Sequence, residues 1–169
     1  KNIDITILRP ATVCGYSPAM RLDVAINALT FGALQNNLIT VYGGKQIRPN
    51  LTMFDMISAY KFSLKKIVKN NRPNSKIIFN LGFENLSIIN MAKRIQKTLK
   101  SKSKIFIKPS NDPRSYRQCS DKLIETGFEQ RFNVDYAIDE ISDAFYNKNL
   151  TDDDSCYTVK WMKDKVLNG

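Results

Sequence analysis

The 169 residues, 43% hydrophobic and 25% charged, fit one globular domain with its own core. No apolar run approaches the roughly 18 residues that span a bilayer, so we expect no membrane partner. There is no histidine and the three cysteines are far apart, which excludes a zinc site and a Ser-His-Asp triad. The odd number of cysteines favours a reducing compartment, and we predict the cytoplasm. The net charge of +10 is compatible with a nucleic-acid surface or with solvated helix faces, and we favour the second because the lysines recur at helical spacing opposite apolar stripes.

A short apolar run, Ile3–Leu8, opens the chain as a β-strand that Pro10 should end, because proline cannot donate to a β-ladder. A strand this apolar is typical of a sheet interior, so we expect it to continue a sheet whose earlier strands are not present. Apolar periodicity then predicts short strands alternating with helices. In chain order these are helix Arg21–Gln35, strand Leu51–Phe54, a helix from Asp55 to about residue 70, strand Lys76–Asn80, a helix from about residue 85 to 99, strand Ile105–Lys108, a short helix from Ser120 to Gly127, and a helix that begins at Asp135.

Two aspartates, Asp55 and Asp135, stand where helices should begin, and we expect each to be the N-cap of its helix. The helix after Asp55 also carries apolar residues at a spacing of about 3.6, which predicts a stripe facing the core. The members of this stripe are Ile57, Tyr60, Leu64 and Ile67.

The stretch Val41–Asp55 combines an aromatic residue, a flexible turn and an arginine within seven positions. Tyr42 is followed by Gly43-Gly44 and then by Arg48. A planar guanidinium next to a glycine turn is suited to bind phosphates, and the aromatic ring is suited to bind a base. We therefore expect this stretch to be central to the binding site.

Four segments occur in an order and spacing that resemble one protein family. They are L-R-P-A-T-V-C-G (8–15), I-T-V-Y-G-G-K-Q-I-R-P-N-L-T-M-F-D (39–55), F-N-L-G-F-E-N-L-S-I (79–88) and D-P-R-S-Y-R-Q-C-S-D (112–121). Together they resemble the second half of the extended short-chain dehydrogenase/reductases, the NAD-dependent epimerase/dehydratase proteins that act on nucleotide sugars. The implied fold class is α/β: the last strand or strands of a Rossmann-type parallel sheet (residues 1–15) and a small mixed α/β C-terminal substrate-binding domain (residues 16–169).

The family's first half carries a glycine-rich dinucleotide motif and a catalytic Tyr-x-x-x-Lys, and this sequence has neither. The resemblance thus implies an NAD(P)-dependent nucleotide-sugar epimerase or dehydratase in its full-length form. It implies that no catalytic residue lies in this chain, that the chain alone is inactive, and that NAD(P) is bound mainly by an N-terminal Rossmann half of the same protein. That half and a nucleotide-sugar substrate are the expected partners, and a homodimer is an open alternative.

The resemblance also implies binding roles for individual residues. Pro10 and Val13 would form the nicotinamide end of the pocket, and Thr12 stands where many relatives have a substrate-binding asparagine. Because threonine lacks the amide, Thr12 could equally be an ordinary residue at a strand end. Tyr42 would contact the base, with a core aromatic as the alternative.

Arginines would bind the diphosphate. Arg48 matches the arginine that grips this group in the family, with a surface arginine in a tight turn as the alternative. Arg117 resembles a second phosphate arginine, and Arg114 is a further candidate. A basic nucleic-acid-binding module and a non-catalytic scaffold of the same fold remain as alternative functions, although the sequence lacks the interleaved aromatic and basic residues of the former.

Overall fold

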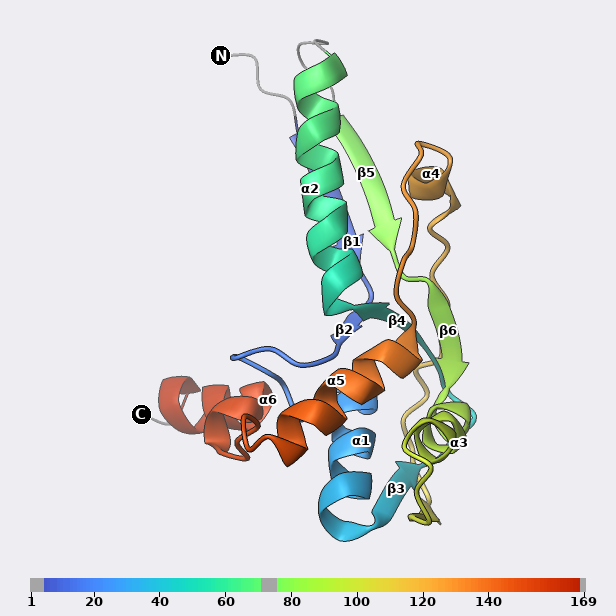
Figure 1. Ribbon diagram of the computed structural model, residues 1–169, viewed down its shortest axis with the longest axis vertical. Helices are drawn as coiled ribbons and strands as arrows, with labels where there is room; N and C mark the ends of the chain where they lie inside the picture. The colour runs from blue at the N-terminus through green and yellow to red at the C-terminus, as the bar shows by residue number, and fades with distance from the viewer. Residues whose placement is uncertain (1–4, 71–75, 168–169) are drawn as a thin grey trace.

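Strands in this α/β protein form three small sheets within residues 5–70 and 76–167, the parts of the chain that the computed structural model describes (Figure 1). All the strand pairs are parallel except that of β4 with β6. The sheets are β1 (Ile5–Pro10) with β5 (Lys76–Leu81), β2 (Thr12–Cys14) with β4 (Ile47–Thr52) and β6 (Glu84–Ser87), and β3 (Leu38–Tyr42) with β7 (Lys104–Lys108).

The helices divide between the two ends of an elongated molecule. α2 lies beside β1 and β5 at one end, whereas α1, α3 and α5 gather around β3 at the other (Figure 1). Across the described ranges, no helix is both long and apolar enough to cross a membrane. The helices are α1 (Ala25–Asn36), α2 (Met53–Asn70), α3 (Ile88–Thr98), α4 (Asp121–Ile124), α5 (Val134–Tyr146) and α6 (Thr158–Met162), with a 3-10 turn at Asp154–Cys156 and a π turn at Lys163–Leu167.

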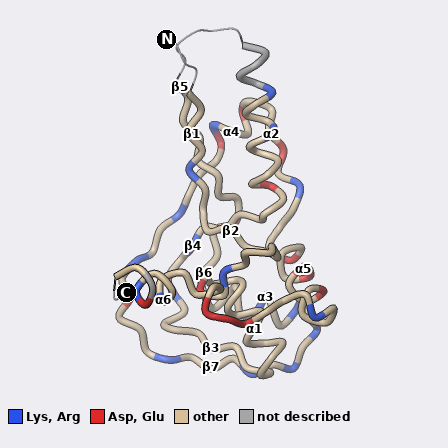
Figure 2. The backbone as a smooth tube through the Cα atoms, turned by 90° about the vertical axis from the view of Figure 1, so that its left-hand side faces the viewer, with Lys and Arg blue, Asp and Glu red and all other residues tan. Residues whose placement is uncertain are grey.

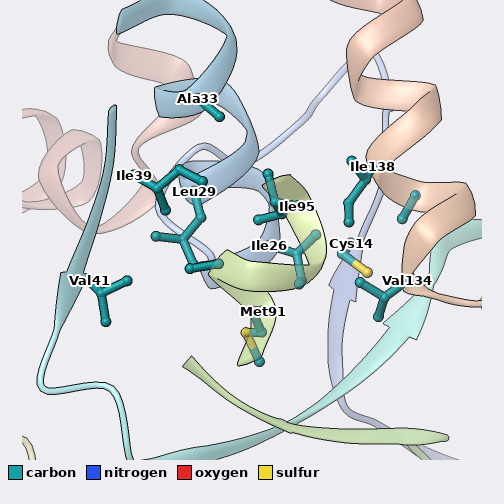
Figure 3. Close-up of a cluster of buried hydrophobic side chains, with 12 residues drawn as sticks. Cys14, Ile26, Leu29, Ala33, Ile39, Val41, Met91, Ile95, Val134 and Ile138 are labelled. Atoms are coloured by element: carbon teal, nitrogen blue, oxygen red, sulfur yellow. The ribbon is translucent and has the colours of Figure 1, made fainter. Parts of the chain in front are cut away.

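The largest apolar cluster fixes α1, α3 and α5 against β3 (Figure 3). Ile26 of α1, Ile95 of α3 and Ile138 of α5 are completely buried in it, together with Ile39 of β3. Burying one such side chain contributes roughly 1.5–3 kcal/mol. A second cluster packs α2 and α4 against β4 and β5. The two clusters thus fix β3 and β4 against the helices.

Strand β1 is shifted relative to the predicted strand. It includes Pro10, which pairs with Leu81 as the last residue of the strand, so the proline does mark its end. Ile3 lies outside the described residues. β4 begins at Ile47 and ends at Thr52, earlier than predicted, because the chain turns into α2 at Met53.

Neither aspartate is the N-cap of its helix, so both predictions were wrong. Asp55 lies inside the first turn of α2, and the hydroxyl of Thr52 accepts from the Asp55 N–H at 3.2 Å. Asn133 caps α5 by accepting from the N–H of Tyr136 at 3.1 Å. Asp135 is the second residue of α5, two positions after Asn133, and its carboxylate pairs with Arg94 of α3.

The predicted inward stripe of α2 faces solvent. Ile57, Tyr60 and Leu64 are exposed, and the side chain of Ile67 lies outside the described part of the structure. The helix instead directs Ala59, with Met56 and Phe62, toward the second cluster. Apolar residues occur on both faces of this helix, so periodicity could not tell which face packs on β4 and β5.

Candidate functional site

A cavity of about 450 Å³ lies where four distant segments meet. Its wall is formed by the start of α1, the end of β3, the start of β4 and residues 110–116, with Thr12 of β2 at one side. Pockets of a few hundred Å³ are typical of small-molecule sites. The cavity is lined by Thr12, Asp23, Val24, Ala25, Ala28, Leu29, Thr40, Tyr42, Gln46, Arg48, Ile88, Ser110, Asp112, Arg114 and Tyr116.

Tyr42 is on the wall of this cavity and not in the core. It is the last residue of β3, its side chain is 57% exposed, and the ammonium of Lys108 lies 5.8 Å from the ring centroid. The neighbours Ile39 and Val41 point the other way and are fully buried. Ile39 and Val41 fill the core from one face of β3, so the alternation of a β-strand places the Tyr42 ring on the opposite face, at the cavity.

The turn after Tyr42 needs its two glycines. Gly43 and Gly44 have φ angles of +77° and +109°, which L side chains rarely adopt. Gln46 closes this turn, since its Oε1 accepts from the Gly44 N–H at 2.7 Å and its Nε2 donates to the Tyr42 carbonyl at 3.3 Å. The turn also contacts the start of α3, where the backbone N–H of Ile89 donates a hydrogen bond to the carbonyl of Gly44 at 3.0 Å.

Arg48 is held firmly and is not a surface arginine. Its side chain is only 14% exposed, and Nη2 donates to Asp112 Oδ2 at 2.9 Å. Nη1 donates to the carbonyl oxygens of Ile47 (3.0 Å) and of Arg114. The guanidinium carbon lies 5.4 Å from the centroid of the Tyr116 ring, within the range of a cation–π contact.

Arg114 meets the same carboxylate from the other side. Its Nε and Nη2 donate to Asp112 Oδ1 and Oδ2 at 2.7 and 2.8 Å, and its backbone N–H donates to Oδ1 at 3.1 Å. These bonds, with the charge of Arg48, hold the pKa of Asp112 well below its usual range. The pKa of Asp23, also on the wall, is lowered by its hydrogen bond to Arg21.

The structure brings together four of the seven predicted site residues: Thr12, Tyr42, Arg48 and Arg114 all line the cavity. The other three are elsewhere. Arg117 is exposed and is not part of the cavity wall. Pro10 lies at the end of β1, and Val13 packs against the second apolar cluster.

Sequence reasoning missed several wall residues. Asp112, Gln46 and Tyr116 all lie within the segments that carry the family resemblance, yet none was assigned a role. The sequence pattern that could have identified Asp112 is an acidic residue two positions before an arginine, a spacing that allows the two side chains to pair. The partner of Arg48 could not be found this way, because 64 residues separate it from Asp112.

Charge elsewhere on the molecule is dispersed. Figure 2 shows Lys and Arg distributed along the described chain, from α2 at one end to β7 at the other, with acidic residues between them. This distribution is typical of solvated surfaces, whereas a nucleic-acid surface gathers its basic residues on one face.

No family model matches the sequence. Solved structures do match. UDP-glucose 4-epimerase from Thermotoga maritima, determined with UDP-glucose, has a TM-score of 0.67 at 18% identity over 86% of this chain and 47% of that one. dTDP-glucose 4,6-dehydratase from Bacillus anthracis, in complex with NAD, has a TM-score of 0.65 at 17% identity over 92% and 47%. UDP-N-acetylglucosamine 4-epimerase from Bacillus cereus has a TM-score of 0.68 at 21% identity over 85% and 48%.

The chain spans about half the length of each of these structures. At this level of identity the likeness concerns the fold. The predicted fold class, an α/β arrangement with parallel strands shared with nucleotide-sugar epimerases and dehydratases, is confirmed.

Proposed function

We propose that this chain is the nucleotide-sugar-binding part of an NAD(P)-dependent epimerase or dehydratase. The observation that carries the proposal is the cavity in which Tyr42, Arg48 and Arg114 meet from three separate segments. UDP-glucose 4-epimerase, whose fold this chain shares, was determined with UDP-glucose, and dTDP-glucose 4,6-dehydratase, of the same fold, was determined with NAD. Thr12, at the side of the cavity, is the proposed contact for the sugar.

The base would bind at the Tyr42 end of the cavity. An aromatic ring that is 57% exposed beside a cavity is available for stacking, which contributes roughly 1–3 kcal/mol per base. Ala28 and Leu29 of α1 supply an apolar surface nearby. A base and ribose placed here would leave the phosphates within reach of β4.

The diphosphate would bind to Arg48 and Arg114. Guanidiniums form charge-assisted, two-point hydrogen bonds with phosphate oxygens, and these two already converge on one point. Arg117, the other predicted phosphate arginine, stays a prediction of lower weight because it is exposed and away from the cavity wall.

The cofactor is expected to lie mainly outside this chain. The sequence has no glycine-rich dinucleotide motif, and Val13, one of the two predicted nicotinamide contacts, packs against an apolar cluster and does not line the cavity. We therefore expect the described residues to supply only part of the cofactor site, and we assign them no catalytic step. Catalysis, whether epimerisation, dehydration or reduction, would depend on an N-terminal Rossmann half, and the chain alone is expected to be inactive.

The predicted division at residue 15 remains a proposal. β1 pairs with β5 and lies beside α2, so the layer at that end of the molecule includes segments from the middle of the chain (Figure 1). The cytoplasmic location and a homodimer likewise remain proposals. The three free cysteines, Cys14, Cys119 and Cys156, support the cytoplasmic location.

The test is calorimetric titration of the chain with UDP, dTDP and UDP-glucose. Arg48→Ala should weaken binding by about 1.5–3 kcal/mol, the scale of a charge-assisted hydrogen bond. Lys65→Ala is the control, because it removes an exposed positive charge on α2 outside the cavity wall, and it should leave affinity unchanged. A folded wild-type chain that gives no heat with any of these ligands would contradict the proposal and favour the non-catalytic scaffold.

A further inference from the structure

The carboxylate of Asp112 lies between the two arginines of the cavity and uses both of its oxygens to hold them. Oδ2 accepts from Arg48 Nη2 at 2.9 Å and from Arg114 Nη2 at 2.8 Å. Oδ1 accepts from Arg114 Nε at 2.7 Å and from the Arg114 backbone N–H at 3.1 Å. A single anion thus already occupies the place where the two guanidiniums meet.

The negative charge of Asp112 offsets the positive charge of the arginines that would bind a diphosphate. The charged side chains on the cavity wall are Asp23, Asp112, Arg48 and Arg114, two of each sign. A diphosphate that entered with Asp112 in place would find no net positive charge and would face a carboxylate at close range. Once Asp112 has left, both guanidiniums are free to donate to phosphate oxygens.

The segment that carries Asp112 is attached in a way that allows it to leave. Lys108, before it, is paired with Tyr42 in the β3–β7 sheet. After it, Ser115 Oγ accepts from the Ile47 N–H at 3.0 Å and Tyr116 N donates to the Ile47 carbonyl at 3.2 Å. Between these anchors, residues 109–114 form a strap, and within the described ranges the hydrogen bonds from the strap to the rest of the chain are those with Arg48.

We propose that Asp112 is an internal competitor for the diphosphate: it holds Arg48 and Arg114 in the free protein, and a nucleoside diphosphate displaces its carboxylate from both guanidiniums while Arg114 stays on the ligand. The ligand exchanges one set of charge-assisted hydrogen bonds for another, so the protein loses part of the affinity that two free arginines would provide. In return, the cavity selects for anions that can engage both guanidiniums. This inference rests on the proposed function.

The test is titration of the chain with UDP, with Asp112→Asn as the principal variant. Asparagine keeps the shape and removes the charge, so Asp112→Asn should bind UDP roughly tenfold more tightly than the wild type. Asp23→Asn is the matched control: it removes a negative charge from the same cavity but from a residue paired with Arg21, and it should change affinity by less than about threefold.

The outcomes separate this inference from the function on which it rests. If the wild type binds UDP and Arg48→Ala does not, but Asp112→Asn binds equally well or more weakly, the competitor is overturned and the proposed function stands. Equal gains in Asp112→Asn and Asp23→Asn would also overturn it, since general charge would explain both. If folded wild-type protein and variants all fail to bind UDP, both proposals fall.

A second measurement needs no variant. Hydrogen exchange of the wild type should become faster at the Arg114 N–H when UDP is added, because this N–H loses its Asp112 acceptor. Slower exchange throughout the strap would mean that UDP closes it, which contradicts the release of Asp112.

Discussion

The carboxylate of Asp55 accepts a hydrogen bond from the backbone N–H of Arg131 at 3.0 Å, across 76 residues of sequence. Its other oxygen accepts from Phe132 N at 3.1 Å and from the Thr52 hydroxyl at 3.2 Å. Asp55 is completely buried. It therefore joins the start of α2 to the segment that leads into α5, and so supports β4 and the arginine that β4 carries.

Replacing Asp55 with alanine should lower the free energy of unfolding by about 2–4 kcal/mol, because two part-buried backbone N–H groups and the Thr52 hydroxyl lose a buried acceptor. Urea unfolding measures the effect. Asp121→Ala is the control, since Asp121 occupies the first turn of α4 but is exposed. An equal loss in the two variants would refute the role of burial.

Arg94 links α3 to α5 and β6. Its Nε and Nη2 each donate to Asp135 at 2.7 Å, and its Nη1 lies 3.2 Å from Glu84 Oε1. Arg94→Met should cost about 1–3 kcal/mol, more than a single surface ion pair, because one partly buried guanidinium serves two carboxylates. Lys93→Met, on the exposed face of the same helix, should cost less than about 0.5 kcal/mol.

The effect of Arg94→Met should also depend on pH. Arg94 lowers the pKa of Asp135, so the stabilisation is present above the pKa of the unfolded chain, near 3.8, and is lost as the pH falls below it. The difference between wild type and variant should therefore shrink below about pH 4. A difference that stays constant down to pH 2 would contradict this.

Gly15 and Gly127 both have positive φ angles, +111° and +93°, but only one has a neighbour at close range. A Cβ on Gly15 would lie 2.7 Å from Glu140 Oε2, whereas a Cβ on Gly127 would meet nothing within 4 Å. Gly127→Ala should cost about 1–2 kcal/mol from backbone strain alone. Gly15→Ala should cost more than this, but only by the amount needed to shift the flexible end of the Glu140 side chain. Thermal unfolding compares the two variants, and equal costs would show that the contact is irrelevant.

Glu140 should make stability fall as the pH rises. Burial raises its pKa from 4.5 to about 7, and Oε2 has no hydrogen-bond partner in the described structure. The native state therefore holds a proton that the unfolded chain has released, and the free energy of unfolding should decrease between about pH 4.5 and pH 7 and then level off. After screening by solvent the decrease should be about 1 kcal/mol.

The test is urea unfolding of wild type and Glu140→Gln at pH 5 and pH 8. The variant cannot ionise, so it should lose most of the difference between the two pH values. Glu129→Gln, at an exposed position, should keep it. A wild type that is equally stable at both values would rule out the effect.

Local sequence determined much of this protein. Apolar periodicity identified the helices from α1 to α5 and four of the strands within a few residues, although β6 (Glu84–Ser87) occupies positions where a helix was predicted to begin. The glycine pair marked the turn after Tyr42, and the phosphate site around Arg48 stays a prediction. These features depend on neighbours along the chain, and so a pattern can reveal them. Segments in family-like order also indicated the fold class.

Tertiary structure decided what long-range contacts control. An aspartate at the start of a helix is a typical N-cap, but the side chain of Asp55 is buried because it accepts from the backbone N–H groups of Arg131 and Phe132. Apolar residues cover both faces of α2, and only the position of β4 and β5 determined which face is buried. Arg48 is bound by Asp112 because folding brings β4 beside a loop 64 residues away, and no local pattern records that contact.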